Sequence, residues 1–330
     1  MSAPIVVTGA AGFIGRNIIA ELNRRGRTDI VAVDRLGSDE RWSNLVGLRV
    51  ADVVDADDYL AEVRSGGAPA AEAVIHLGAC SATTERDAGF LLRNNYRYTR
   101  TLCEWSLARG ARFVYASSAA TYGDGAQGYS DDDAVTPTLK PLNMYGYSKH
   151  LFDLWALESG ALARIAGLKY FNVYGPFEGH KQDMRSVVCK AHARISAGED
   201  VELFRSHHPD FRDGEQQRDF VYVRDAVAVT LWLAERGAPS GLFNCGTGQA
   251  RSWRDLALAL FSALGVLPRI RLVDMPEHLR AKYQCFTQAD MAKLRRAGYT
   301  APFTSLEDGV RNYVRTHLGG IPARAAGATA

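Results

Sequence analysis

The sequence reads Pro4-Ile5-Val6-Val7-Thr8 and continues at once with Gly9-Ala10-Ala11-Gly12-Phe13-Ile14-Gly15. The first part is a short apolar, β-branched run, which is typical of a buried parallel strand. The three glycines permit a tight turn, and a helix is predicted over residues 16–25. The N-terminus of this helix would present free N–H groups and a positive dipole to the pyrophosphate of a dinucleotide. The spacing is G-x-x-G-x-x-G, which indicates such a site only together with further features.

A second predicted strand supplies one of these features. Residues 30–33 are apolar and end in Asp34, nineteen residues after Gly15. An acidic side chain at this distance accepts a hydrogen bond from the adenosine ribose. Arg35 and Arg41 follow closely, and either guanidinium could neutralise a 2′-phosphate that Asp34 would otherwise repel. The residues alone therefore leave both NADP and NAD possible.

Strands and helices alternate through the first half of the chain. Further strands are predicted over 73–77, 112–116 and 168–171, with helices around 55–64, 86–109 and 146–165. This alternation predicts an α/β fold, a doubly wound parallel sheet of Rossmann type. After Gly175-Pro176 the pattern changes to a helix over 184–197, a strand over 201–204, a polar loop over 206–217 and helices around 252–264 and 304–317.

The change of pattern predicts two lobes. The dinucleotide-binding domain comprises 1–175, with 218–248 returning to it. A smaller mixed α/β lobe for the substrate comprises 176–217 and 249–318, and the Ala/Gly-rich tail 319–330 is predicted to be disordered.

Composition narrows the class of protein. The chain has 330 residues, 47% of them hydrophobic, and a formal net charge of only +2 with dispersed basic residues. We therefore expect neither nucleic acid nor a membrane surface as a partner. Five widely spaced cysteines without a C-x-x-C pair favour buried reduced thiols over disulfides or a metal site. No apolar run approaches ~18 residues, and these features together predict a cytoplasmic enzyme without metal.

Tyr145 and Lys149 are the strongest indication of chemistry. On a helix, residues four apart share a face with Cβ atoms roughly 5–6 Å apart. An ammonium at that range is expected to lower the tyrosine pKa from about 10 towards the working pH. Such a tyrosine can take a proton from an alcohol while a hydride leaves the same carbon. Ser118 ends the preceding strand, where open α/β sheets bind ligands, and its hydroxyl can bond the reacting oxygen.

The motifs together resemble the extended short-chain dehydrogenase/reductase superfamily, from about residue 4 to residue 318. The resemblance is carried by the glycine turn, the strand end His76-Leu77-Gly78-Ala79, Asn94-Asn95-Tyr96, Tyr115 to Gly123, and the Tyr145/Lys149 pair. Within it, three segments are similar to the ADP-glyceromanno-heptose 6-epimerase family: residues 78–85, 170–181 and 283–290.

This resemblance implies a homo-oligomer, a pentamer where members are characterised, with tightly held NADP(H). Members invert C6 of the heptose in ADP-heptose for the lipopolysaccharide inner core of Gram-negative bacteria. The cofactor contacts that it implies are Phe13, Ile14, Asp34, Arg35, Leu77, Gly78, Ala79, Cys80, Ser81, Asn94, Lys149 and Val173. The glycines of the turn, Gly9, Gly12 and Gly15, and Arg41 are further cofactor candidates from the sequence pattern itself.

The implied catalytic pair is Tyr145 and Lys181, and the implied substrate contacts include Asn172, Arg218 and Tyr283. Ser118 and the segment Phe204, Arg205 and Ser206 are also expected to meet the substrate. The chain departs from the family between 181 and 218, where Asp183 and Lys190 replace other polar residues and the loop 205–215 is longer. These two residues are kept as candidate substrate contacts.

Inversion of a carbinol carbon by redox requires the substrate to turn, so the alcohol proton is handled from two positions. Tyr145 is the first candidate acid/base, and Lys181 the second if desolvation lowers its pKa. A nucleotide-sugar 4,6-dehydratase is disfavoured because Ala119 and Ala120 stand where an acidic pair is needed. A UDP-sugar 4-epimerase and a non-catalytic dinucleotide-sensing protein remain as alternatives.

Overall fold

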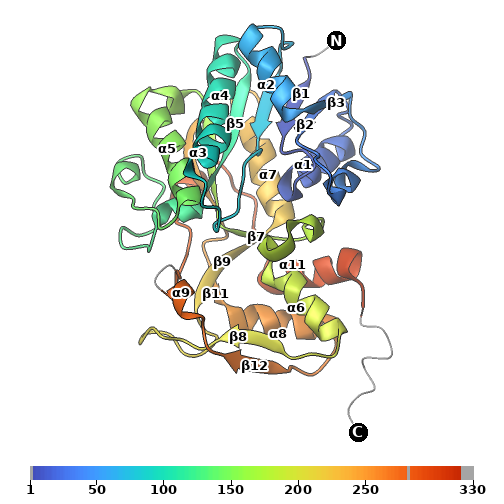
Figure 1. The fold of residues 1–330 in the computed structure, drawn as a ribbon, viewed down its shortest axis with the longest axis vertical. Coiled ribbons are helices and arrows are strands. Elements are labelled where there is room, and N and C mark those ends of the chain that lie inside the picture. The colour runs from blue at the N-terminus through green and yellow to red at the C-terminus, as the bar shows by residue number, and fades with distance from the viewer. Residues whose placement is uncertain (1–2, 281–282, 321–330) are drawn as a thin grey trace.

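The computed structural model describes residues 3–280 and 283–320, without the side chains of Gln182, Asp183, His278 and Leu279. A seven-stranded, entirely parallel sheet forms the larger part of the molecule (Figure 1). Its spatial order is β10-β6-β5-β4-β1-β2-β3. The strands are β1 (Ile5–Thr8), β2 (Ile30–Asp34), β3 (Asp52–Asp55), β4 (Ala73–His76), β5 (Arg112–Ser118), β6 (Ala166–Tyr170) and β10 (Gly241–Cys245).

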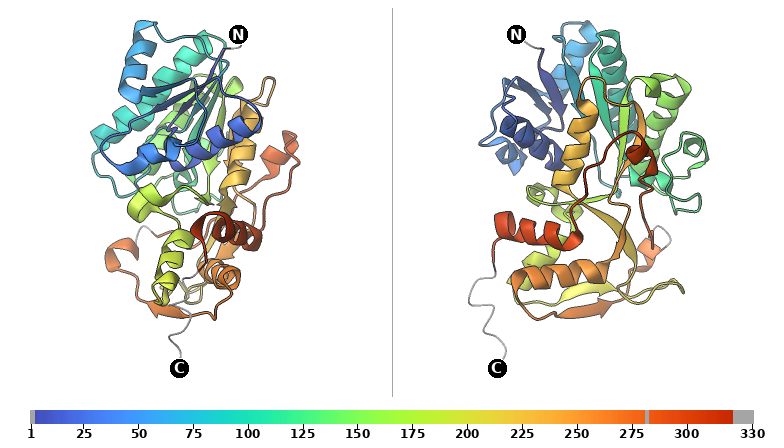
Figure 2. Two further views of the ribbon diagram at one scale, coloured as in Figure 1. Left: turned by 90° about the vertical axis from the view of Figure 1, so that its right-hand side faces the viewer. Right: turned by 180° about the vertical axis from the view of Figure 1, so that it is seen from behind.

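Helices cover both faces of this sheet, as Figure 2 shows from two further sides. One face carries α1 (Phe13–Arg24) and α7 (Val223–Ala234), which share a core around Ile18, Ile19 and Val227. The other face carries α2 (Ala56–Ser65), α5 (Met144–Glu158) and a continuous helical run of α3 (Ala88–Leu91), the π-helical η2 (Leu92–Arg97) and α4 (Tyr98–Ala108). Tyr59 and Phe152 belong to the core on that side. The prediction of a doubly wound α/β fold is therefore confirmed.

A smaller part lies beyond the carboxyl ends of the strands (Figure 1). A three-stranded sheet there has the order β11 (Ala250–Ser252), β9 (Gln217–Tyr222), β7 (Asn172–Tyr174), and β8 (Val201–Phe204) pairs with β12 (Ile270–Val273). Helices α6 (Val187–Ser196), α8 (Trp253–Leu264) and α11 (Leu306–Tyr313) pack with them around Leu203 and Leu256. Shorter helical segments are η1 (Glu40–Leu45), η3 (Ala119–Tyr122), η4 (Thr136–Thr138), η5 (Ala161–Ala163), η6 (Gly179–Met184), α9 (Glu277–Arg280), α10 (Ala292–Arg296) and η7 (Val314–Leu318).

The boundaries differ from the sequence-based expectations at informative places. The helix predicted over 146–165 ends at Glu158, and Ala166 already starts β6. β3 was not predicted because it is an exposed edge strand of sequence Asp-Val-Val-Asp, whose pattern lacks a buried face. The segment expected to return at 218 first forms β9 of the small sheet, and the return to the large sheet begins with α7. Of the predicted tail, residues 321–330 lie outside the described residues.

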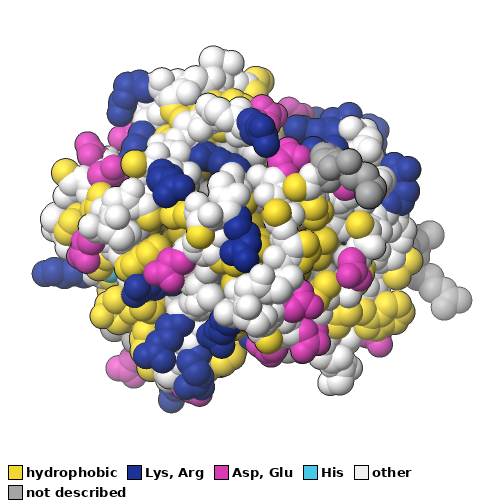
Figure 3. Space-filling view, turned by 90° about the horizontal axis from the view of Figure 1, so that it is seen from above, with side chains coloured by type: hydrophobic (Ala, Val, Ile, Leu, Met, Phe, Trp, Pro, Cys, Tyr) yellow, Lys and Arg dark blue, Asp and Glu magenta, His cyan; other side chains and the backbone are white. Residues whose placement is uncertain are grey.

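Surface charges are mixed in sign (Figure 3), and the thiols are free. Acidic and basic side chains are interspersed over most of the face shown in Figure 3, in keeping with the net charge of +2. All five cysteines are free, but only Cys103 and Cys245 are buried, so the prediction of burial holds for two of them. No helix in the described ranges is long and apolar enough to cross a membrane.

Asp131 is a buried carboxyl group that makes folding depend on pH. It is 2% exposed and accepts the Asn244 N–H at 2.7 Å. Burial raises its pKa from 3.8 to about 6, and the Asn244 N–H and the Lys293 ammonium only partly oppose this. Because the folded pKa exceeds the unfolded one, the contribution to stability is complete below about pH 4 and is lost as the pH rises through about 6.

We therefore expect Asp131→Asn to become more stable relative to the wild type between pH 4 and pH 7, by about 3 kcal/mol. The amide keeps an oxygen that can accept from Asn244 but carries no charge to desolvate. Urea unfolding at several pH values measures this difference. Asp132→Asn, a change at the exposed neighbour, is the control, and a pH-independent difference for Asp131→Asn would contradict the assignment.

Candidate active site

The glycine turn between β1 and α1 leaves no room for side chains. Gly9 has a φ of +67°, and a Cβ there would lie 2.8 Å from the Gly78 nitrogen. Gly12 donates to the Gly9 carbonyl at 3.0 Å and precedes the first helical residue without a side-chain cap. The N–H groups of Phe13 and Ile14 therefore remain free at the helix N-terminus. A bare backbone cradle with free donors fits the pyrophosphate of a dinucleotide.

Asp34 joins this turn to the end of β2. Its carboxylate accepts the Ala11 N–H at 2.8 Å and the Arg35 N–H at 2.8 Å. Burial raises the pKa of Asp34, and these backbone donors oppose the rise. The carboxylate thus lies beside the glycine turn, where the sequence predicts an acceptor for a ribose hydroxyl.

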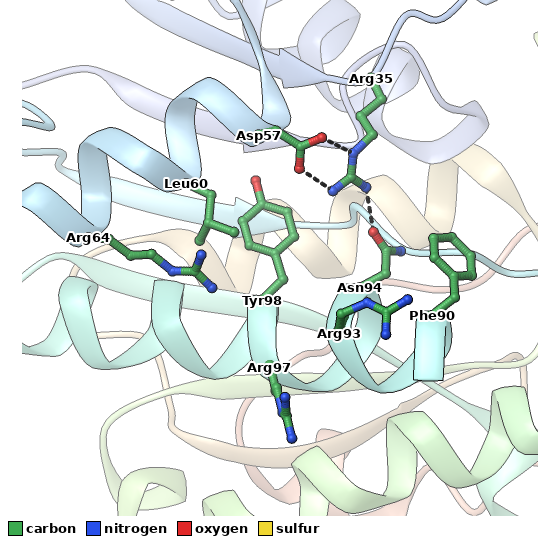
Figure 4. A pocket seen from close by; sticks show the side chains of 9 residues that line it. All are labelled: Arg35, Asp57, Leu60, Arg64, Phe90, Arg93, Asn94, Arg97 and Tyr98. Atoms are coloured by element: carbon green, nitrogen blue, oxygen red, sulfur yellow. Dashed lines mark hydrogen bonds and ion pairs between the residues drawn. The ribbon is translucent and has the colours of Figure 1, made fainter. Parts of the chain in front are cut away.

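Arg35 and Arg41 both lie next to Asp34, but each already has a carboxylate partner. Arg35 contacts Asp57 at 2.5 Å and also donates to Asn94. Arg41 contacts Asp39 at 2.8 Å. Both candidate phosphate ligands are therefore held in ion pairs, and both pairs lie at the surface, that of Arg35 in the pocket drawn in Figure 4.

The segment that follows β4 contacts both the strand end before the glycine turn and helix α5. The Gly78 N–H donates to Thr8 Oγ1 at 3.1 Å, and Leu77 leads into the loop that holds Ala79 and Ser81. Asn95 accepts the Cys80 N–H at 2.9 Å and donates to Ser148 Oγ at 3.0 Å. Asn94 is buried and donates to Asn95 at 3.0 Å. The predicted cofactor segment is therefore tied through Asn95 to α5.

Ser118, Tyr145 and Lys149 meet at the carboxyl end of β5. A hydrogen bond joins the Ser118 and Tyr145 side chains, and Lys149 Nζ donates to the Ala116 carbonyl at 2.8 Å. Burial raises the pKa of Tyr145, which the Ser118 bond opposes, and burial lowers the pKa of Lys149 to about 8. The prediction that Lys149 lowers the Tyr145 pKa is wrong in this structure, because the ammonium is bound to Ala116 and desolvation dominates.

A buried charge network lies directly behind this trio. Asp153, one turn after Lys149 on α5, accepts from Tyr115 at 2.9 Å and from Ser117 at 2.7 Å. Lys169 on β6 is also fully buried and lies 3.9 Å from the Asp153 carboxylate. Ser117 is thus a structural serine, and the negative charge of Asp153 partly compensates the burial of Lys149.

Lys181 reaches the glycine turn from the loop that follows β7. Its ammonium lies 5.4 Å from the centre of the Phe13 ring. Burial lowers its pKa, as predicted, although the charged neighbour that the structure gives it is the acid Glu178 and not a second cation. An amine with a lowered pKa can exchange a proton near neutral pH.

Three contacts hold the Lys181 loop in place, two of them from α1 and one from η1. Asn17 donates to the Pro176 carbonyl at 3.0 Å, and the Arg16 guanidinium lies 3.7 Å above the Phe177 ring. Asn44, next to the glycine turn, contacts His180 Nδ1 at 2.9 Å. Phe177 takes a φ of +72°, which is rare for a bulky residue and is sustained here by these contacts.

The predicted substrate residues fall into one cluster and several separate positions. Arg218 is 6% exposed and lies 5.0 Å above the Tyr283 ring, and Phe204 meets the same ring edge-on at 6.3 Å. Trp253 completes this cluster by donating to Tyr283 Oη at 2.9 Å. Burial lowers the pKa of Arg218. No carboxylate in the described part of the chain forms an ion pair with its guanidinium. A buried, uncompensated guanidinium suits a diphosphate.

The other substrate candidates whose side chains are described lie apart from this cluster. Asn172 is exposed on β7 beside the half-buried Val173, and Lys190 is exposed on α6. Arg205 lies 3.5 Å from Asp274, and the Ser206 N–H donates to Asp213 at 2.8 Å. The side chain of Asp183 lies outside the described residues.

Sequence reasoning did not single out Trp253, Asn95 or Asn44. Trp253 is the first residue of α8, so an apolar periodicity along the helix does not mark it as a neighbour of Tyr283. Asn95 lies inside the Asn94-Asn95-Tyr96 motif, whose pattern does not show which side chain joins the two segments, and Asn44 lies in the short helix η1. Their importance arises from contacts between distant segments, which no local pattern reveals.

A doubly wound sheet with a glycine turn at its crossover and a Ser–Tyr–Lys trio at its carboxyl edge defines a short-chain dehydrogenase/reductase. The model of the NAD dependent epimerase/dehydratase family matches residues 5–246. The ADP-L-glycero-D-manno-heptose-6-epimerase of Nitratidesulfovibrio vulgaris strain DP4 is 57% identical over 314 residues, which cover 95% of this chain and 97% of that protein. The chain belongs to the ADP-L-glycero-D-manno-heptose-6-epimerase branch of this family.

More distant relatives agree. The Fusobacterium nucleatum protein of the same description is 45% identical, covering 95% of this chain and 98% of its own. The crystal structure of the Helicobacter pylori ADP-L-glycero-D-manno-heptose-6-epimerase matches with a TM-score of 0.78 at 28% identity, covering 95% and 96% of the two chains. UDP-glucose 4-epimerase from Thermotoga maritima matches with a TM-score of 0.76 at 27% identity, covering 94% and 97%.

Gly15→Ala tests the turn. A methyl group there would overlap the Gly9 carbonyl oxygen and approach Ala10 Cα to 3.1 Å. We expect the turn to shift and the protein to lose about 1–3 kcal/mol of stability, together with most of its bound dinucleotide. Unfolding by urea and the nucleotide released on denaturation measure the two effects. Gly67→Ala, where a Cβ meets ordinary contacts at 3.5 Å, is the control, and equal nucleotide content in both variants would contradict the role of the turn.

Proposed function

We propose that this chain converts ADP-D-glycero-D-manno-heptose to ADP-L-glycero-D-manno-heptose by inverting C6, which supplies a lipopolysaccharide inner-core precursor. The relatives at 57% and 45% identity have this activity in their descriptions. The observation that carries the proposal is the pairing of Ser118 with Tyr145 on one side and Lys181 over Phe13 on the other. Separate elements thereby supply the two candidate acid/base groups, Tyr145 on α5 and Lys181 in η6 beside the first residue of α1.

NADP is the cofactor that we assign, with NAD as the alternative. When bound, it would supply a nicotinamide that can accept a hydride from C6 and return it to the opposite face. Arg35 and Arg41 flank Asp34, and their partners Asp57 and Asp39 are 65% and 48% exposed. Exposed ion pairs contribute only about 0–1 kcal/mol, so a doubly charged 2′-phosphate can replace either carboxylate.

The two bases act in turn. With the sugar in one orientation, the Ser118 hydroxyl holds the C6 oxygen and Tyr145 exchanges its proton. With the sugar turned over, Lys181 exchanges the proton from the other side, since burial favours its neutral amine. Arg218 binds the diphosphate throughout, so the nucleotide stays anchored while the heptose turns.

The proposals for assembly, location and partners rest on the same family. The protein acts as a homo-oligomer in the cytoplasm, with ADP-heptose as its partner and without nucleic acid or membrane. Its modest net charge of +2 supports the last two statements.

Tyr145→Phe tests the first base. Removal of the hydroxyl eliminates proton exchange, and we expect turnover of ADP-D-glycero-D-manno-heptose to fall about 10²–10⁴-fold. NMR of the product measures inversion at C6, and the nucleotide released on denaturation shows that the cofactor is retained. UDP-glucose is the control substrate. Inversion of UDP-glucose at C4 by the wild type, without turnover of ADP-heptose, would contradict the proposed function.

Lys181→Met tests the second base separately. The variant keeps Tyr145, so we expect dismutation of an aldehyde analogue of the sugar nucleotide to continue while full epimerisation falls about 10²–10⁴-fold. Lys140→Met, at an exposed surface lysine, is the matched control. Wild-type rates of epimerisation in Lys181→Met would remove this lysine from the mechanism.

A further inference from the structure

Glu178 is a buried carboxyl group in the loop that carries Lys181. Its side chain is 0% exposed, and it lies three residues before Lys181, between β7 and η6. The Lys181 N–H donates to the Glu178 carbonyl at 3.0 Å. A bond between residues three apart closes a 3-10 turn, so the backbones of the two residues are directly linked. Sequence motifs assign no role to this carboxylate.

Neutral donors surround the Glu178 carboxylate. Ser186 donates to it from its N–H and from its hydroxyl, the latter at 2.6 Å, and the Gly175 N–H donates to it at 3.4 Å. The hydroxyl of Tyr313 on α11 also bonds to it. A buried carboxylate keeps its charge only where such donors replace water. These donors come from three separate segments, so the charge is held in a fixed place.

Lys181 is close to this charge but is not paired with it. Within the described side chains, no ion pair joins Lys181 to Glu178, and the ammonium lies instead over the Phe13 ring. Burial lowers the pKa of Lys181, and the negative charge of Glu178 opposes this. A direct ion pair would hold the amine charged, whereas burial alone would hold it neutral. A charge held at a distance leaves both forms accessible, as an acid/base group requires.

Other ionisable side chains around this loop come from several elements. They are Arg16 of α1, Asp39 and Arg41 at η1, His180 and Arg185 on either side of Lys181, Cys189 of α6 and His317 of η7. Asp39 and Arg41 act on His180, and Arg16 acts on His317. Of the described acids, Glu178 is the one that acts on Lys181. Removal of its charge therefore leaves the desolvation of Lys181 less opposed.

We propose that Glu178 is a positioning residue for Lys181: it anchors the turn that carries this lysine and supplies the negative charge that keeps the amine able to take up a proton. The inference rests on the proposed function, in which Lys181 accepts the proton of the C6 hydroxyl in one direction of the reaction and returns it to the C6 oxygen in the other. Glu178 is fully buried, so it acts on the substrate only through Lys181.

Four variants separate the charge of Glu178 from its packing. Glu178→Gln removes the charge and keeps the size and one acceptor oxygen, and Glu178→Asp keeps the charge on a shorter side chain. Tyr313→Phe removes one donor to the carboxylate and leaves its charge. Glu158→Gln, at an exposed glutamate that ends α5, is the control for the change in net charge.

The first measurement follows Lys181 without any turnover. The purified holoenzyme is labelled with a trace of acetic anhydride over a range of pH, and modification of the partly exposed Lys181 is quantified by peptide mass. Because only the neutral amine reacts, the midpoint of labelling reports the protonation of Lys181. We expect Glu178→Gln to lower this midpoint by about one pH unit. Glu178→Asp should restore it, and Tyr313→Phe and Glu158→Gln should leave it unchanged.

The second measurement is the pH dependence of epimerisation in both directions. An amine with a lower pKa loses its proton earlier as the pH rises. We therefore expect the limb of the rate profile that belongs to Lys181 to move to lower pH in Glu178→Gln by the same amount as the labelling midpoint. Should Glu178→Gln alone not fold, the same change in the Asp131→Asn background, which is expected to be more stable, supplies both measurements.

An unchanged labelling midpoint in folded Glu178→Gln would overturn the proposal, and so would a uniform loss of rate without any shift in pH, since packing alone explains such a loss. A lowered midpoint in a protein whose wild type does not epimerise ADP-heptose has a different meaning. It would remove the proposed function and leave the effect of Glu178 on Lys181 standing.

Discussion

The close contact between Gly9 and the backbone of Gly78 is the constraint on which this site depends. A Cβ on Gly9 would lie 2.8 Å from the Gly78 nitrogen, so the ends of β1 and β4 can meet only as bare backbone. These two strands are neighbours at the point where the strand order of the sheet reverses. The crevice at such a point is where open α/β sheets bind ligands. Because α1 starts from the same turn, its free N–H groups are aimed into that crevice.

Desolvation is the common cause of the unusual protonation behaviour around this crevice. Burial raises the pKa of Tyr145 and lowers the pKa of both Lys149 and Lys181. Each shift favours the neutral form. For the two lysines this moves the pKa towards the working pH, whereas for Tyr145 it moves the pKa away from it. Asp153 and Lys169 show the same physics in a structural role, as a buried pair that stabilises the strand ends behind the catalytic trio.

The two parts of the molecule contact each other beside Lys181. Contacts of Arg16, Asn17 and Asn44 with the loop 176–180 hold Lys181 above the glycine turn. The same loop follows directly from β7, which pairs with β9 of the smaller sheet. The pairing of β7 with β9 therefore connects Arg218, the proposed diphosphate ligand, to the loop that carries Lys181, the proposed second base.

The sequence by itself determined the glycine turn, Asp34, the Ser118, Tyr145 and Lys149 trio and the doubly wound sheet. These features are local, because they depend on spacing along one strand, turn or helix. Only the tertiary structure decided that Lys149 binds the Ala116 carbonyl, that Trp253 joins Arg218 and Tyr283, and that Ser186 and Tyr313 bond to the buried Glu178. Such arrangements depend on burial and on contacts between residues far apart in the chain, and neither is encoded in any local pattern.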